Sequence, residues 1–138
     1  MCSSAPLAYP ASKRDPIRVL VADDNASMRK IIRSFLEELP DVEICAVAKN
    51  GTEAVDAART LEPDLLILDV VMPDLSGVEV ASVVKKTLPR SKVILFTMYG
   101  DTVGKALARS AGVDIVLAKT RGLSALSEKI NAVIDEMT

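Results

Sequence analysis

The chain has 138 residues, of which 49% are hydrophobic, 26% charged and 3% aromatic, and its formal net charge is −2. These values are typical of one globular domain that buries its core without a disulfide or a structural metal. The small net charge and the lack of a Lys/Arg cluster argue against direct nucleic-acid binding. Because the chain has no histidine, Ser-His or Cys-His catalysis and histidine metal ligation are excluded.

Two further features indicate the compartment. No stretch approaches the roughly 20 apolar residues that span a bilayer, and the N-terminal residues lack the basic and apolar regions of a secretory signal. Cys2 and Cys45 show neither metal-site spacing nor a disulfide framework, and Cys45 is interpreted as a small core residue. We therefore expect a cytoplasmic protein with no membrane contact.

Hydrophobic patterning predicts the elements in chain order. Residues 1–16, with three prolines and no apolar period, are predicted to be a disordered leader. Beyond them, apolar runs predict strands, and apolar positions at helical spacing predict helices. The expected strands are 17–22, 42–47, 65–68, 92–96 and 114–118, and the expected helices are 28–39, 51–60, 78–88, 102–111 and 123–134.

Two details of these helices are predicted. Asn25 or Ser27 is expected to cap the first helix by accepting from its free N–H groups. The helix over 102–111 is weakly amphipathic, and Gly104 in its interior costs it about 1 kcal/mol relative to alanine.

Continuous rather than alternating apolar strands indicate a sheet that is covered on both faces. Such strands are typical of a parallel sheet between two layers of helices. We therefore predict one doubly wound α/β domain, with five strands and five helices, over residues 17–138.

Polar side chains follow four of the predicted strands. The carboxyl ends of parallel strands meet at one edge of the sheet, so these side chains are expected to share one crevice. They are Asp23 and Asp24 after the first strand, Asp69 after the third, Thr97 after the fourth and Lys119 after the fifth.

Three carboxylates in one crevice repel one another unless they are protonated or share a hard cation, and Mg²⁺ is the expected cation. With the charge neutralised, Asp69 can attack phosphorus through a carboxylate oxygen to form an acyl phosphate. Lys119 would then pair with one phosphoryl oxygen, and the Thr97 hydroxyl would donate to another. Taken singly, these residues have simpler explanations as helix caps, a turn residue and a solvated lysine. Complementary side chains at the ends of four strands favour instead a shared site for phosphoryl transfer.

Four motifs carry a resemblance to a known family: 21–25 (VADDN), 68–77 (LDVVMPDLSG), 96–99 (FTMY) and 118–119 (AK). Over residues 17–137 the chain resembles the response-regulator receiver domain of bacterial two-component signalling, the CheY-like domain. The resemblance implies the flavodoxin-like strand order 2-1-3-4-5 and Asp69 as phospho-acceptor. It also implies Asp24 as a direct Mg²⁺ ligand, Asp23 acting largely through a bound water, and the Val71 backbone carbonyl as the remaining protein ligand.

The resemblance also implies partners. A sensor histidine kinase or phosphotransfer protein would supply the phosphoryl group, and small acyl phosphates can substitute for it. Such a domain is a switch and not an enzyme: Thr97 moves toward the phosphoryl group, and the surface of the fourth helix, fifth strand and fifth helix changes its preference for an output partner. A phosphorylation-dependent homodimer is compatible with this surface but is not fixed by the residue pattern.

Two departures from the family, and two bulky side chains beside Thr97, bear on the mechanism. Val116 stands where the family often has an aromatic residue coupled to the threonine, so the chain has no aromatic side chain at that position, and Val116 and Tyr99 are the candidate switch partners. Thr120 replaces the usual proline after Lys119, so the peptide between them is either trans or a cis bond costing about 2.5–4 kcal/mol. Met98 and Tyr99 are bulky enough to narrow access to Asp69 and to tune the lifetime of the phosphorylated form.

The motifs at 96–99 and at Lys119-Thr120 also resemble receivers of LuxR-type (NarL/FixJ-like) regulators, in which a DNA-binding domain follows. This leaves two possibilities: a single-domain regulator, or the receiver half of a transcription factor whose DNA-binding domain lies outside these 138 residues.

Other classes fit less well. A haloacid-dehalogenase-type phosphohydrolase carries Asp-x-Asp after its first strand, where this chain has Asp23-Asp24-Asn25. A flavin- or nucleotide-binding module should have a glycine-rich or hydroxyl-rich phosphate loop there. A pseudo-receiver, which binds partners without phosphorylation, usually lacks an acid, the threonine or the lysine. All are present here, and Val116 and Thr120 are what keep this alternative open.

Overall fold

The computed structural model describes residues 15–98 and 104–137, and within them strands and helices alternate. No helix in this described part is both long and apolar enough to cross a membrane. The strands are β1 Ile17–Ala22, β2 Val42–Ala48, β3 Leu65–Leu68, β4 Lys92–Thr97 and β5 Ile115–Ala118. The helices are α1 Ala26–Glu37, α2 Gly51–Leu61, α3 Gly77–Thr87, α4 Lys105–Ser110 and α5 Gly122–Glu136, and a 3₁₀ turn, η3 Lys119–Arg121, precedes α5.

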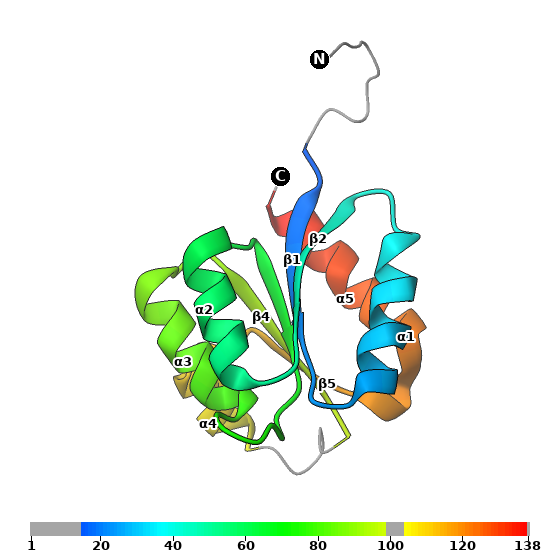
Figure 1. Ribbon diagram of the computed structural model, residues 1–138. Helices are drawn as coiled ribbons and strands as arrows, with labels where there is room; N and C mark the ends of the chain where they lie inside the picture. The colour runs from blue at the N-terminus through cyan, green and yellow to red at the C-terminus, as the bar shows by residue number, and fades with distance from the viewer. Residues whose placement is uncertain (1–14, 99–103, 138) are drawn as a thin grey trace.

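The five strands form one parallel sheet in the order β2-β1-β3-β4-β5, which confirms the predicted order. Figure 1 shows α1 and α5 on one face of the sheet and α2, α3 and α4 on the other. The register pairs Ala22 with both Ala48 and Leu68, and Thr97 with Ala118. The loops that follow the strands therefore lie together beyond the carboxyl ends of the strands, while β1 begins and α5 ends at the opposite end of the sheet.

The core explains why the strands are apolar throughout. All four residues of β3 are buried, and side chains from each central strand point alternately into two clusters, one on each face. Leu20 and Leu66 pack under α2 and α3, whereas Val19 and Ile67 pack under α1 and α5. Burial of both faces thus confirms the layered architecture that the apolar runs predicted.

Most predicted elements differ from the structure by one or two residues at an end, and the fourth helix and fifth strand show the physical reason. The fourth helix begins at Lys105, since the Gly104 carbonyl accepts from the Ala108 N–H in the manner of an N-cap residue, so the cost predicted for an interior glycine does not apply. The fifth strand begins after Asp114, whose carboxylate accepts from the Val93 N–H. The first two residues of the predicted fourth helix, and 1–14 of the predicted leader, lie outside the described residues.

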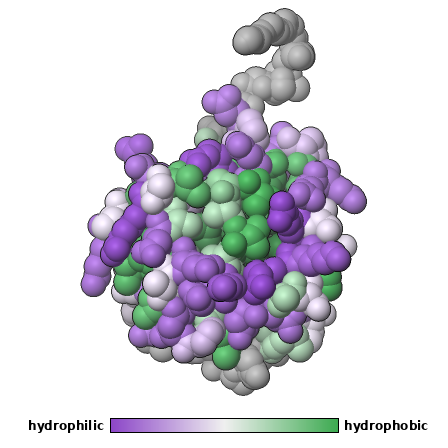
Figure 2. Space-filling view, viewed as in Figure 1, coloured by the Kyte–Doolittle hydropathy of each residue, from purple (hydrophilic) through white to green (hydrophobic). Residues whose placement is uncertain are grey.

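Strand β2 forms an exposed edge of the sheet. Figure 2 shows a mainly hydrophobic area over this strand, between α1 and α2. Its register with β1 shifts between Ile44 and Ala46, which leaves Cys45 as a bulge, and bulges discourage edge-to-edge pairing. Cys45 is half-buried and packs against the core, and burial raises the pKa of its thiol, which makes the thiol less reactive.

Candidate functional site

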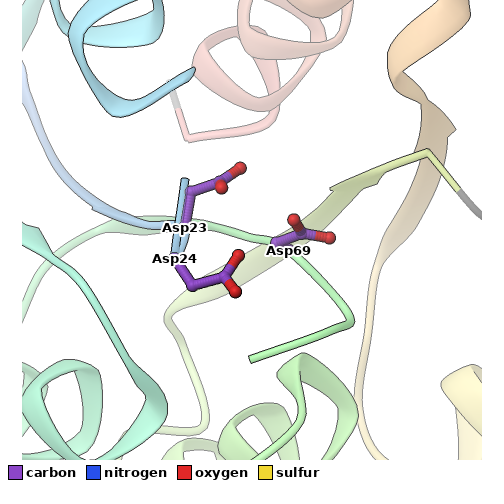
Figure 3. A group of neighbouring side chains, drawn as sticks. All are labelled: Asp23, Asp24 and Asp69. Carbon is purple, nitrogen blue, oxygen red and sulfur yellow. The ribbon is translucent and has the colours of Figure 1, made fainter. Parts of the chain in front are cut away.

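The structure brings three carboxylates together where β1 and β3 end. Asp23 and Asp24 follow β1, Asp69 follows β3, and one oxygen from each lies within 4.8 Å of the others. Figure 3 shows the three side chains extending to the same side of these two strand ends. Asp23 and Asp69 are buried and Asp24 is exposed, so the cluster opens to solvent through Asp24.

Backbone hydrogen bonds fix the positions of these acids. The Asp69 N–H donates to the Ala22 carbonyl at 3.0 Å, and the Asp23 N–H donates to the Ala48 carbonyl at 3.2 Å. The Asn25 side chain caps α1 by accepting a hydrogen bond from the Met28 N–H at 2.9 Å. Of the two predicted cap residues, Asn25 and not Ser27 is therefore the N-cap. The acids therefore extend directly from the ends of the paired strands.

Lys119 neutralises part of this negative charge. Its Nζ donates to Asp23 Oδ2 at 2.6 Å and to Asp69 Oδ2 at 3.0 Å, and its side chain is 6% exposed. Burial acts to lower the pKa of Lys119, but the hydrogen bonds to two carboxylates outweigh it and raise that pKa. Burial also raises the pKa of Asp23, which the bond to Lys119 offsets only in part. Lys119 is thus a charged amine held between two acids from different strands.

The loop that follows Asp69 returns to it at Gly77, where the two backbone segments are in close contact. Gly77 begins α3, and its N–H donates to the Val70 carbonyl at 3.0 Å. A Cβ at residue 77 would lie 2.2 Å from the Asp69 carbonyl oxygen, closer than real Cβ contacts. Ser76 caps α3 in a capping box with Glu79. Only glycine therefore allows α3 to start directly against Asp69.

Replacing Gly77 by alanine is expected to lower the free energy of unfolding by about 3 kcal/mol, at the upper end for overpacking, because the clashing atom is backbone. Urea denaturation measures this loss. Gly122→Ala isolates backbone strain, because nothing lies within 4 Å of the added Cβ but the backbone, with φ +87° and ψ 175°, is one that essentially only glycine adopts; it should cost about 1–3 kcal/mol. A Gly77→Ala variant as stable as the parent would contradict the steric argument.

Asp74, in the same loop, makes contacts that the sequence pattern did not reveal. Its Oδ1 accepts from the N–H groups of Gly51 and Leu75 at 2.9 and 2.7 Å, and its Oδ2 accepts from the Thr52 N–H at 2.9 Å and from the Thr52 hydroxyl. The Thr52 hydroxyl, with the backbone donors, holds the pKa of Asp74 well below its usual range. Acid residues in turns are common, so a partner 23 positions away gave no sequence signal.

The remaining predicted residues lie around this cluster. Thr97 is the last residue of β4 and is buried, whereas Val116, on β5, is half-buried. The described residues contain no cis peptide bond, so Lys119 and Thr120 are joined by a trans peptide. Tyr99 lies outside the described residues.

A pocket of about 390 Å³ opens over the acid cluster. Asp24, Asp69 and Lys119 line it on the polar side. Its apolar lining includes Val71 and Met98, whose side chains are exposed. The rest of the lining comes from the start of α1: Asn25, Ser27, Met28 and Ile31.

The donor set fits a hard divalent cation. Three carboxylates from two strand ends supply only oxygen, and one of them is open to solvent, which suits an ion such as Mg²⁺ that keeps several waters. Among the described residues no cysteine joins this cluster, and the chain has no histidine, so the thiolate and imidazole ligands that favour softer metals are not supplied.

Comparisons with known proteins agree with this arrangement. Residues 19–131 match the family model described as the response regulator receiver domain. The response regulator protein VraR of Staphylococcus saprophyticus is 37% identical over 115 residues, covering 83% of this chain and 55% of that protein. This chain thus spans about half the length of the curated relatives that it matches.

Solved structures give the same family. TrrA of Thermotoga maritima, a response regulator solved in complex with Mg²⁺ and BeF, is 34% identical, with a TM-score of 0.76 and coverage of 85% of this chain and 98% of that chain. A LuxR-family DNA-binding response regulator from Staphylococcus aureus is 29% identical, with the same TM-score and coverage. The predicted family and its LuxR-type likeness are confirmed, and the chain belongs to the response regulator receiver domain family of two-component signalling proteins.

Proposed function

We propose that residues 17–138 are a phosphorylation switch in which Asp69 accepts a phosphoryl group from a sensor histidine kinase or phosphotransfer protein. The observation that carries this is the Asp69 carboxylate at the end of β3, within reach of two other acids and bonded to Lys119. A carboxylate oxygen of Asp69 forms the new bond to phosphorus, the bond from phosphorus to the donor atom breaks, and its electron pair leaves with the donor.

Different residues around Asp69 would bind Mg²⁺ and the phosphoryl oxygens. Asp24 would bind Mg²⁺ directly, Asp23 would act through water, and the Val71 backbone carbonyl would complete the protein ligands. When bound, Mg²⁺ supplies positive charge that offsets the carboxylates and the incoming phosphoryl oxygens. Lys119 Nζ would pair with one phosphoryl oxygen, and the Thr97 hydroxyl would donate to another.

The switch would be read at the α4, β5 and α5 surface. Thr97 stands at the end of β4, directly paired with Ala118 of β5, so its movement toward a phosphoryl group would act on that strand. Val116 gives no aromatic side chain to follow this movement. We propose that a separate partner or a DNA-binding domain in a longer protein responds to this surface, in the cytoplasm, and that the domain is a switch and not an enzyme.

The exposed apolar rim of the pocket supports docking of a protein donor. Ile31, Val71 and Met98 are each 47% or more exposed, and all three line the pocket that holds Asp69. A protein donor could cover this rim while it presents its phosphoryl group, which would exclude water from the reacting atoms. Small acyl phosphates would reach Asp69 without using the rim.

Asp24→Ala tests the metal assignment. Removing one of three mutually repelling carboxylates should keep or raise the melting temperature without metal, and should abolish the rise that Mg²⁺ causes in the parent. Thermal melts with and without Mg²⁺ measure both. Asp41→Ala, which removes an exposed acid between α1 and β2, should keep the rise. A Mg²⁺-dependent rise that survives in Asp24→Ala would count against Asp24 as a ligand.

A further inference from the structure

The loop between β3 and α3 carries residues on which the proposed Mg²⁺ site depends. It leaves the acid cluster at Asp69, passes Val71 in the pocket wall and returns at Gly77. The bond from the Gly77 N–H to the Val70 carbonyl closes its base. This bond spans only the base of the loop, so the residues between Val70 and Gly77 depend on other contacts.

Asp74 fixes that outer part to α2. Its carboxylate accepts from the first two N–H groups of the helix, those of Gly51 and Thr52, and from the Thr52 hydroxyl. A negative charge at a helix N-terminus is favourable, and hydrogen bonds to an ionised group are stronger than neutral ones. The loop also packs directly on the helix start, because a Cβ on Gly51 would lie 2.5 Å from the Cβ of Leu75.

The start of α2 is itself connected to the acid cluster. The Ala48 carbonyl, two residues before the cap residue Asn50, accepts from the Asp23 N–H at 3.2 Å. Asp74 therefore joins the loop that carries Val71 to the segment that aligns Asp23. These two segments meet around the same group of carboxylates.

We infer that Asp74 is a positioning residue for Mg²⁺ binding: it holds the loop against α2 so that the Val71 carbonyl and Asp69 stay in place relative to Asp23. This inference rests on the proposed function. It requires no contact between Asp74 and the ion. Loss of the Asp74 bonds should leave the acids present but let the loop move, so that the ligands must be ordered when the ion binds.

Three variants test this by Mg²⁺ titration calorimetry on the full chain, at a temperature where circular dichroism shows each variant folded. Asp74→Ala should raise the Mg²⁺ Kd about tenfold, the lower end for groups that orient metal ligands. Asp74→Asn keeps one acceptor oxygen and should raise the Kd less. Thr52→Val removes the hydroxyl donor without changing charge and should also raise it. Asp56→Asn, which removes an exposed charge from α2, is the control and should leave it unchanged.

The phosphorylation rate with acetyl phosphate gives a second readout. In Asp74→Ala it should fall at low Mg²⁺ and approach the parent's rate at saturating Mg²⁺, which general destabilisation would not produce. An unchanged Kd in Asp74→Ala would overturn the inference alone. So would equal rises in Asp74→Ala and Asp74→Asn with none in Thr52→Val, because charge would then be the cause. A parent chain that binds no Mg²⁺ would overturn the proposed function as well.

Discussion

Asp69→Asn is expected to accept no phosphoryl group while keeping the fold. The amide has nearly the shape of the carboxylate, and Asp69 lies at the end of β3 and not inside the core, so the packing is retained. An amide oxygen is a far weaker nucleophile than a carboxylate, so bond formation to phosphorus should stop. Mass spectrometry after incubation with acetyl phosphate and Mg²⁺ measures the loss, and circular dichroism checks the fold.

Two controls separate this result from a general effect of charge. Asp56→Asn makes the same chemical change on an exposed part of α2 and should be phosphorylated like the parent. Asp69→Glu keeps the carboxylate but moves it by one methylene, and should react slowly or not at all, since the near-attack geometry is lost. Phosphoryl labelling that persists in Asp69→Asn would remove Asp69 as the acceptor.

Lys119→Met should lower the rate of phosphorylation by about 10²–10³-fold, the usual loss when one donor to a developing charge is removed. The methionine side chain fills similar space but supplies no cation for the phosphoryl oxygens. Single-turnover labelling with acetyl phosphate at saturating Mg²⁺ measures the rate. Lys86→Met, on an exposed part of α3, should react like the parent.

The same variant has a second expected effect, on stability. Lys119 bridges Asp23 and Asp69, so its loss leaves their charges without this partner and should lower the melting temperature in metal-free buffer. Saturating Mg²⁺ should reduce the difference from the parent, because the ion supplies positive charge at the same carboxylates. A phosphorylation rate within a few-fold of the parent would contradict the assigned role of Lys119, whatever the melting temperatures show.

Much of the fold was predictable because one physical signal dominated it. Strands such as β3, buried on both faces, must be apolar at every position, and their ends are marked by the first polar residue. The convergence of Asp23, Asp69 and Lys119 followed from parallel strand direction alone, without knowledge of any contact. The strand order needed more, because apolar runs do not specify their neighbours, and it came from the family resemblance.

What the sequence did not predict depends on pairings between distant positions. The contact of Asp74 with the start of α2 joins two loops, each of which has an unremarkable turn composition. The bulge at Cys45 depends on the register between two strands, which hydrophobicity does not encode. The weak amphipathic pattern did not show whether Gly104 lay inside the fourth helix or capped it, so the pattern could not predict that α4 begins after Gly104.

The central claim is that Asp69 forms an acyl phosphate in the presence of Mg²⁺. Its most direct test is the intact mass of the parent chain after incubation with acetyl phosphate, with Mg²⁺ and with a chelator, followed by reductive trapping and peptide mapping. We predict one added phosphoryl group that depends on Mg²⁺, is removed by hydroxylamine and maps to Asp69. No adduct at saturating Mg²⁺, or an adduct that maps to another residue, would contradict the account.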